Sequence, residues 1–131
     1  MAKYAYPAIF TKEETGYSVV FPDIEGCFTC GDTLPEAMEM AEDALCLMLY
    51  DCEEDGEAIP VPSDVKTVQE RTKEIVSLVF CDTVEYRKLY DNRVVKKTLT
   101  IPNWLNTLSE RAGINFSTVL QDALKSKLDI Q

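Results

Sequence analysis

The sequence predicts an α+β protein with two domains, residues 1–91 and 92–131. Three observations support this prediction. Short apolar runs separated by turn residues open the chain, which is typical of an antiparallel sheet. A long helical pattern follows, in which apolar residues recur every three or four positions. The end of the chain then repeats the change from strand to helix on a smaller scale. The length of 131 residues suits one medium domain or two small ones.

The first domain is expected to begin with a meander of three short strands. They cover residues 4–11, 17–21 and 26–30, and polar turns with glycine or proline separate them. Pro22 ends the second strand because proline has no N–H to donate to a strand ladder. A fourth apolar run, residues 74–80, is predicted to be a central strand.

A long helix is expected to follow the meander. Thr33 can cap it, Pro35 suits its first turn, and Glu36 completes a Thr-x-x-Glu capping box. Gly56 is expected to end it. The apolar stripe that should face the sheet consists of Leu34, Ala37, Met38, Ala41, Leu45, Met48 and Leu49.

The stretch between Gly56 and the fourth strand is expected to be a polar loop. After that strand, residues 82–92 fit a short helix that Asp82 or Thr83 could cap. The boundary between the domains is expected at Asp91–Arg93, so the short helix would close the first domain.

The second domain is expected to contain one strand and two helices. The strand covers Val94–Ile101, and helices over about 103–112 and 116–128 follow it. The residues that can cap or end these helices are Asn103, Asn115 and Gly113.

This second domain is too small to be stable by itself. So short a piece rarely buries enough apolar surface, and a lone strand leaves its backbone groups unpaired. Two copies solve both problems if their strands pair antiparallel. We therefore expect a homodimer through residues 92–131, in which Lys96, Thr98 and Thr100 lie on the free face of a two-stranded ribbon. Higher oligomers are compatible with this arrangement.

A two-stranded ribbon fits the major groove of DNA, where lysine and threonine can contact base edges. The start of the last helix offers free N–H groups that can bind a phosphate. The residues expected to contact DNA are Lys96, Thr98, Thr100, Asn115 and Ser117. A simpler interpretation stays open, in which the first three form a solvated sheet face and the last two only cap a helix.

Charge is unevenly distributed along the chain, whose net charge is −10. Residues 1–92 hold seven Lys/Arg and twenty Asp/Glu, whereas residues 93–131 hold six Lys/Arg and three Asp/Glu. An acidic body with a basic tail suggests two partners of opposite charge. Solubility alone would also explain the acidic body.

The composition narrows the chemistry that the chain can perform. It has five cysteines and no histidine, so the commonest general base and metal ligand is missing. The CFTC pair at residues 27–30 has no second pair with which to complete a zinc site. No metal or other cofactor is expected. No apolar run approaches the roughly 18 residues that would span a bilayer, so a cytoplasmic protein without a membrane partner is expected.

Two stretches carry a resemblance to known families. KKTLTIPNWLNTLSERAGINFSTVLQDAL resembles a ribbon-helix-helix DNA-binding domain, and it includes a GINFS turn between the helices. YSVVFPDIEGCFTCGDTLPEAMEMAEDAL, with IPVPS after it, resembles the N-terminal domain of the HicB antitoxins. The two stretches together cover most of the chain.

This resemblance implies a fold and two partners. The first domain should have a partial RNase H-like sheet without nuclease activity, and it should bind and neutralise a small basic toxin of the HicA type, an mRNA ribonuclease. The second domain should bind operator DNA and repress the operon. The residues expected to contact the toxin are Asp23, Glu25, Asp32, Glu36 and Glu39. An acidic helix face could also be a solvated surface only.

Two other functions are weighed beside this one. Asp23 and Asp32 could belong to a carboxylate-dependent metal nuclease, although aspartate in turns is usually engaged in local hydrogen bonds. A stand-alone transcription regulator could use the first domain to sense a small molecule. The resemblance favours the antitoxin, which needs no catalysis by this chain.

Overall fold

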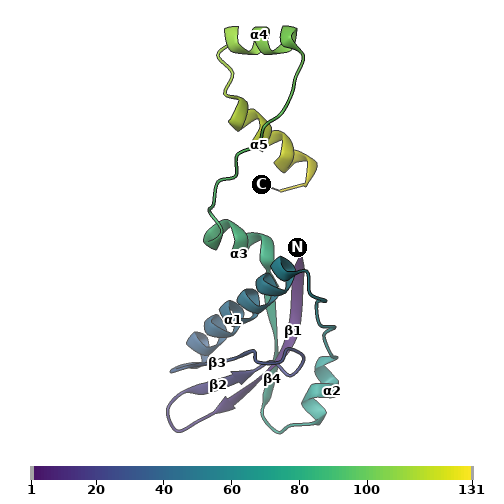
Figure 1. Ribbon diagram of the computed structural model, residues 1–131. Helices are drawn as coiled ribbons and strands as arrows, with labels where there is room; N and C mark the ends of the chain where they lie inside the picture. Colours follow the sequence, from purple (N-terminus) through teal and green to yellow (C-terminus); the bar gives the residue numbers. More distant parts are fainter. Residues whose placement is uncertain (1, 131) are drawn as a thin grey trace. The chain divides into compact units, whose positions relative to one another are not determined.

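The computed structural model describes residues 2–130, and the chain forms two compact units (Figure 1). The first unit ends at Arg93 and the second begins at Val94. A four-stranded sheet with helices makes up the first unit, and two helices with the segment before them make up the second.

The sheet of the first unit is antiparallel throughout, with the strand order β3-β2-β1-β4. Its strands are β1 (Lys3–Lys12), β2 (Tyr17–Val20), β3 (Phe28–Gly31) and β4 (Ile75–Asp82). The predicted meander is confirmed, with ends that differ by one or two residues. The prediction of a central fourth strand is wrong, because β4 pairs only with β1 and lies at an edge. The β4 sequence is apolar because side chains on both faces of the strand are apolar, and not because the strand lies between two others.

Helix α1 (Leu34–Asp55) lies across one face of this sheet (Figure 1). The predicted start is confirmed, since the Thr33 hydroxyl accepts a hydrogen bond from the Glu36 N–H at 3.2 Å. The Glu36 carboxylate reaches back to the N–H of Asp32, one residue before the usual partner in a capping box. The predicted end is confirmed too, because Gly56 has a φ of +68°.

The core of the first unit lies between α1 and the sheet. The apolar stripe of the helix is largely as predicted, but Leu34 and Met38 are exposed and Cys46 is buried instead. The buried residues of this core are Tyr6, Ala8, Phe10, Val19, Phe21, Ile24, Cys27, Ala37, Ala41, Leu45, Cys46, Leu49, Val79 and Cys81.

The predicted polar loop after α1 contains a short helix, α2 (Val65–Glu70), which the sequence interpretation missed. Asp64 caps it by accepting the Lys66 N–H, and Val68 is its one buried side chain. Its single buried position is too little to produce a helical pattern, which explains the error. The Gln69 side chain accepts the N–H of Val76 and so attaches α2 to the start of β4.

Helix α3 (Thr83–Tyr90) follows β4 directly. Of the two predicted caps, Asp82 is the one in use, since its carboxylate accepts the N–H groups of Val84 and Glu85. The Thr83 side chain is fully buried and holds the Glu53 carboxylate at 3.0 Å. The predicted short helix is therefore confirmed, and it packs against α1.

The second unit contains α4 (Asn103–Arg111) and α5 (Phe116–Lys127). Asn115 caps α5 by accepting the Thr118 N–H at 3.1 Å, as predicted. The predicted cap at Asn103 is wrong: Pro102 occupies the cap position and no side chain caps α4. Gly113 has a φ of +70°, as expected between the helices.

The predicted strand over Val94–Ile101 is absent from the single chain, whose residues 91–102 carry no regular secondary structure. The physical reason is the lack of a neighbour, because a strand is held by hydrogen bonds to another strand. Across the two units, no helix among residues 2–130 combines the length and the apolar character needed to cross a bilayer.

Candidate functional site: an acidic groove and an open apolar face

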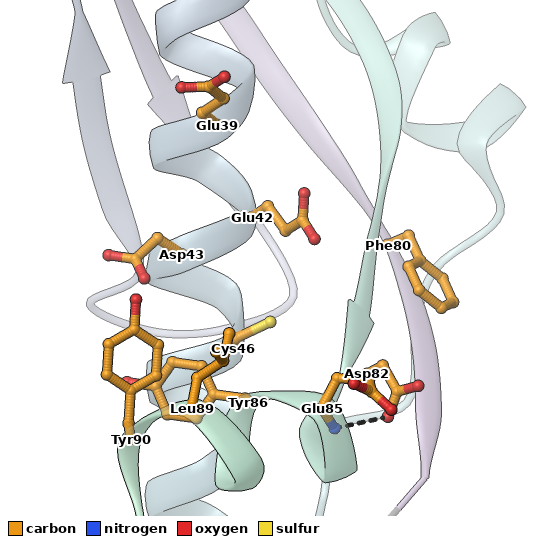
Figure 2. A pocket seen from close by; sticks show the side chains of 10 residues that line it. All are labelled: Glu39, Glu42, Asp43, Cys46, Phe80, Asp82, Glu85, Tyr86, Leu89 and Tyr90. Carbon is orange, nitrogen blue, oxygen red and sulfur yellow. Dashed lines mark hydrogen bonds between the residues drawn. The ribbon is translucent and has the colours of Figure 1, made fainter. Parts of the chain in front are cut away.

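The first unit has a groove of about 370 Å³ between α1, β4 and α3 (Figure 2). Figure 2 shows α1 and β4 side by side, with α3 closing the groove at one end. The lining residues come from all three elements: Glu39, Glu42, Asp43, Cys46, Phe80, Asp82, Glu85, Tyr86, Leu89 and Tyr90.

The groove is strongly acidic. Five of its lining residues are carboxylates, and none is a lysine or an arginine. Helical spacing explains why three of them share one side of α1: Glu39, Glu42 and Asp43 follow the three-and-four spacing beside the buried stripe. The Asp82 carboxylate already accepts two N–H groups of α3, and the Glu85 carboxylate pairs with Lys88 at 2.9 Å, so the three carboxylates of α1 are the ones most available to a ligand.

Aromatic rings form the closed end of the groove. Tyr86 and Tyr90 lie with ring centroids 4.6 Å apart, and the Tyr50 ring lies 5.4 Å from that of Tyr86, tilted by 49°. The Arg87 guanidinium lies 4.7 Å from the Tyr50 ring centroid. Tyrosine and carboxylate side chains together can bind lysine or arginine through cation–π contacts and charged hydrogen bonds.

Two cysteines lie beneath the groove. The pKa of the Cys46 thiol is lowered, chiefly by a hydrogen bond with Cys81 and further by the backbone N–H of Asp82, while burial and nearby carboxylates oppose this. The pKa of Cys81 is raised, first by the same hydrogen bond and then by burial. Cys81 is fully buried and packs in the core, whereas Cys46, which is also buried, reaches the floor of the groove.

A hydrogen-bond network holds α3 in place and so gives the groove its shape. The Glu53 carboxylate of α1 accepts from the Tyr4 hydroxyl at 2.8 Å, the Thr83 hydroxyl at 3.0 Å and Arg87 at 3.1 Å. Burial alone would raise the pKa of Glu53, but the hydrogen bonds to its carboxylate, these three among them, outweigh it and lower the pKa to about 2. Arg87 also pairs with Glu54, which ties α3 to the last turn of α1.

Of the five residues predicted to contact a toxin, only Glu39 lines the groove. Asp23 instead accepts the Ser63 N–H at 2.9 Å and the Ser63 hydroxyl, so it fastens the loop after α1. Glu36 is used at the start of α1. Glu25 and Asp32 are exposed in the turns beside β3.

The remaining groove residues were not among those predicted to bind. Glu42 and Asp43 belong to the acidic helix face, which is a signal present in the sequence. Asp82, Glu85, Tyr86 and Tyr90 become neighbours of that face only because β4 and α3 fold beside α1. No spacing in the sequence indicates that long-range contact.

The carboxylates do not form a metal site among residues 2–130. No group of three or more histidine, cysteine, aspartate or glutamate side chains in this part of the chain is arranged to hold a metal ion. Asp23 and Asp32, on which the nuclease hypothesis depended, are not brought together in such a cluster.

The second unit exposes its apolar residues. Neither α4 nor α5 has a buried residue, and Trp104 and Leu108 are more than half exposed. A second groove of about 490 Å³ opens between the extended segment and α5. It is lined by Lys97, Leu99, Ile101, Asn106, Phe116, Ser117, Val119, Leu120 and Ala123.

The residues predicted to contact DNA all belong to this unit. Lys96, Thr98 and Thr100 are exposed along the extended segment. Asn115 caps α5, and Ser117 is exposed in the first turn of the same helix. The alternation of the extended segment places Leu99 and Ile101 in the apolar groove, on the other side from the threonines.

The fold and the two surfaces define a binding protein in two parts, an acidic sheet-and-helix unit and a small helical unit with an open apolar face. The profile of a family described as "HicB_like antitoxin of bacterial toxin-antitoxin system" matches residues 6–121. The chain belongs to this family of HicB-like antitoxins.

Individual relatives agree with this assignment. The chain is 48% identical over 58 residues to antitoxin HicB 2 of Photorhabdus laumondii, a match that covers 44% of this chain and 42% of that relative. The chain spans less than half the length of the curated relatives that it matches.

Solved structures match over a larger share. A toxin–antitoxin complex from Streptococcus pneumoniae contains a chain that is 32% identical, with a TM-score of 0.60 over 95% of this chain and 99% of that one. A HicA3–HicB3 toxin–antitoxin complex matches 60% of this chain and 99% of its own at 27% identity, with a TM-score of 0.50.

Proposed function

We propose that this chain neutralises a HicA-type toxin by binding it through the first unit. The acidic groove between α1, β4 and α3 carries the proposal, because its carboxylates and tyrosines suit a basic protein surface. Two similar structures are described as toxin–antitoxin complexes, and one of them names HicA3 as the toxin. Neutralisation then follows from covering the surface with which the toxin binds RNA.

Glu39 is the residue for which the sequence prediction and the groove agree. We extend the proposed contact to Glu42, Asp43 and Glu85, which line the same groove. We propose only peripheral toxin contacts for Glu25, Asp32 and Glu36, near the start of α1. Asp23 acts in it indirectly, by holding the loop at Ser63.

The test is co-expression with the small protein encoded beside this chain. The wild-type chain should co-purify with that protein and restore growth. Glu42→Lys should raise the dissociation constant about tenfold and steepen its salt dependence, because it places a positive charge in the groove. Glu14→Lys makes the same charge change in the exposed turn after β1 and should bind like the wild type. Equal binding by the two variants would show that the groove is not the contact surface.

We further propose that the second unit dimerises as a ribbon-helix-helix domain and represses its own operon. The exposed apolar residues of this unit support the proposal, since nothing within residues 94–130 covers them. Pairing two copies of residues 94–101 would satisfy their backbone groups and bring Leu99 and Ile101 against the helices of both copies. The proposed boundary between the two functional domains stays at residues 91 and 92.

On the free face of that ribbon, Lys96, Thr98 and Thr100 would contact base edges. Asn115 and Ser117 would place the N-terminus of α5 against a phosphate. With only one lysine and no arginine on the ribbon face, phosphate contacts would contribute a large share of the affinity.

A footprinting experiment on the DNA upstream of the operon tests this second function. Thr98→Ala combined with Thr100→Ala should reduce protection about tenfold or more, because both threonines leave the ribbon face. Toxin neutralisation by the same variant should be unchanged. Unchanged DNA protection would show that the segment does not read DNA.

The proposed function requires no catalysis by this chain, and membership in an antitoxin family fits a non-enzymatic regulator. The sheet with one covering helix is compatible with a partial RNase H-like arrangement.

Incubation with labelled RNA and Mg²⁺ tests the nuclease alternative. That alternative requires RNA turnover, and Asp23→Ala or Asp32→Ala should abolish it. A cytoplasmic location belongs to the same proposal, since both proposed partners, a ribonuclease and operator DNA, act there.

A further inference from the structure

The outer edge of β4 has a defined pattern of backbone groups. Residues of a strand direct their N–H and C=O alternately to its two sides. The Val76 N–H points outward, since it donates to the Gln69 side chain rather than to β1. Thr83 lies an odd number of positions after Val76, so its N–H should point to the other side of the strand. It does point inward, where it donates to the Ala2 carbonyl at 3.2 Å. The outward set is therefore Val76, Leu78, Phe80 and Asp82.

Both ends of this outer edge are occupied. Gln69 of α2 takes the N–H of Val76, and its amide group donates to the Glu74 carbonyl at 2.9 Å. At the other end the Asp82 N–H points to the Cys46 thiol, where α3 begins. Between them, only the Leu78 carbonyl has a further partner, the Ser77 hydroxyl at 3.3 Å. The N–H of Leu78 and both backbone groups of Phe80 thus form an open window in the described part of the chain.

The two sides of the window differ in chemistry. On the α1 side lie Glu39, Glu42 and Asp43, and Figure 2 shows Glu42 directed toward β4. On the opposite side, the Leu78 and Phe80 side chains are 54% and 52% exposed. Figure 2 shows the Phe80 ring pointing away from α1, on the far side of β4 from the acidic side chains.

We propose that an extended segment of the toxin adds to the outer edge of β4 as a fifth strand at Leu78 and Phe80. This inference rests on the proposed neutralisation of a toxin and names the segment chemistry that the first unit recognises. Backbone hydrogen bonds would supply affinity, and alternate side chains would supply specificity. The incoming strand would carry basic side chains toward α1 and apolar side chains toward Leu78 and Phe80.

A second copy of this chain is a poorer occupant of the same edge. Symmetric pairing of two β4 strands would bring the acidic grooves of both copies together, and like charges across paired strands are destabilising. The carboxylates beside the edge thus disfavour self-association, which an exposed apolar strand otherwise promotes. A basic segment has the opposite effect, because it neutralises them.

The first test measures amide exchange by NMR in the full ¹⁵N-labelled chain, alone and with the co-purified toxin. The Leu78 and Phe80 amides should exchange quickly in the free chain and slow about tenfold or more in the complex. The Val79 amide, which faces β1, serves as the internal reference and should be protected in both states. Protection of Leu78 and Phe80 in the free chain at high concentration would instead identify a second copy as the occupant and overturn the proposal.

The second test compares two substitutions at one position. Phe80→Pro removes the outward N–H, a change that an edge strand tolerates because no internal hydrogen bond is lost. It should raise the dissociation constant for the toxin about tenfold, whereas Phe80→Ala, which keeps the N–H, should raise it less. Thermal unfolding of both variants checks that the first unit is folded.

The two proposals fail in different ways. If the toxin does not bind the wild-type chain, both the neutralisation and the edge pairing are wrong. If it binds and neither amide gains protection, the toxin uses the groove without the strand edge, and only this inference is overturned. Should Phe80→Pro fold and bind like the wild type, the same conclusion follows without the exchange data.

Discussion

Gly31 lies where the last residue of β3 meets the first turns of α1. A Cβ at this position would lie 2.5 Å from the backbone nitrogen of Ala37 and 2.7 Å from its Cα. Both are backbone atoms of a helix, so neither can move aside as a flexible side chain could. The absence of a side chain at residue 31 is what lets α1 approach the sheet so closely.

Gly31→Ala is therefore expected to destabilise the first unit by about 1–3 kcal/mol, because α1 must shift away from β3. Urea denaturation followed by circular dichroism measures this change. Gly26→Ala is the matched control: its added Cβ meets nothing within 4 Å, but its φ of +78° is unfavourable for alanine. It should cost about 1 kcal/mol, from backbone strain alone. A larger loss for Gly26→Ala than for Gly31→Ala would contradict this explanation.

Single residues also show where sequence interpretation reaches its limit. The sequence predicts Thr33, Gly56 and Asn115 correctly as caps or helix ends, and Asp82 as one of two candidate caps, because capping depends on neighbours within a few positions. For Asp23 the sequence predicts toxin contact, and the structure adds a hydrogen-bond partner, Ser63, that is 40 positions away. A polar residue in a turn gives no local sign of so distant a partner.

At the scale of elements, Glu53 shows how one carboxylate joins three parts of the first unit. It receives hydrogen bonds from β1 through Tyr4, and from α3 through Thr83 and Arg87. Its pKa falls from the ordinary 4.5 to about 2 in the folded protein. A group with a lowered folded pKa stabilises the fold above its unfolded pKa, and that contribution is lost as the pH falls from about 4.5 to about 2.

Glu53→Gln should thus lower the free energy of unfolding at pH 7 by about 2 kcal/mol, since it leaves three partly or fully buried donors with a weaker acceptor. Between pH 4.5 and pH 2, the variant should lose less stability than the wild type. Denaturation midpoints in urea at pH 7, 4.5 and 3 give both quantities. Glu14→Gln, in an exposed turn, should reproduce the wild-type pH dependence, and an equally steep decline in Glu53→Gln would exclude the network as its cause.

The elements themselves were predictable to unequal degrees. Strands β1 to β3 and helices α1, α3, α4 and α5 follow from turn residues, caps and apolar periodicity. The place of β4 at the edge does not follow, because an apolar run shows that both faces of a strand are apolar but not how many neighbours it has. The groove depends on that same place, so only its α1 side was visible in the sequence.

At the scale of the whole molecule, the two units differ in what each needs in order to fold. The first unit has a core of buried side chains from the sheet and α1, whereas α4 and α5 have no buried residue. The first unit should then be stable at any concentration. The second should gain structure only when two chains meet.

Leu99→Asp is expected to test this difference, because it places a charge in the apolar groove of the second unit. The variant should sediment as a monomer at concentrations at which the wild type is a dimer, and it should lose helical circular dichroism. The tyrosine bands of its near-ultraviolet spectrum, which report the first unit, should be retained, whereas the Trp104 band of the second unit should weaken. Thr98→Asp, one position away on the proposed free face, should remain dimeric. A monomeric Thr98→Asp would show that the two faces of the segment are assigned incorrectly.

Under the proposed repression, the lack of an interior in the second unit would link gene control to the abundance of the chain. When copies are scarce, residues 94–130 would be open to proteases, and cleavage there would first remove the part proposed to read DNA. The trimmed remainder would keep its own core and its acidic groove. A cell that runs low on this protein would thus release the promoter before it loses protection from the toxin, and fresh synthesis would begin while the remaining copies still act.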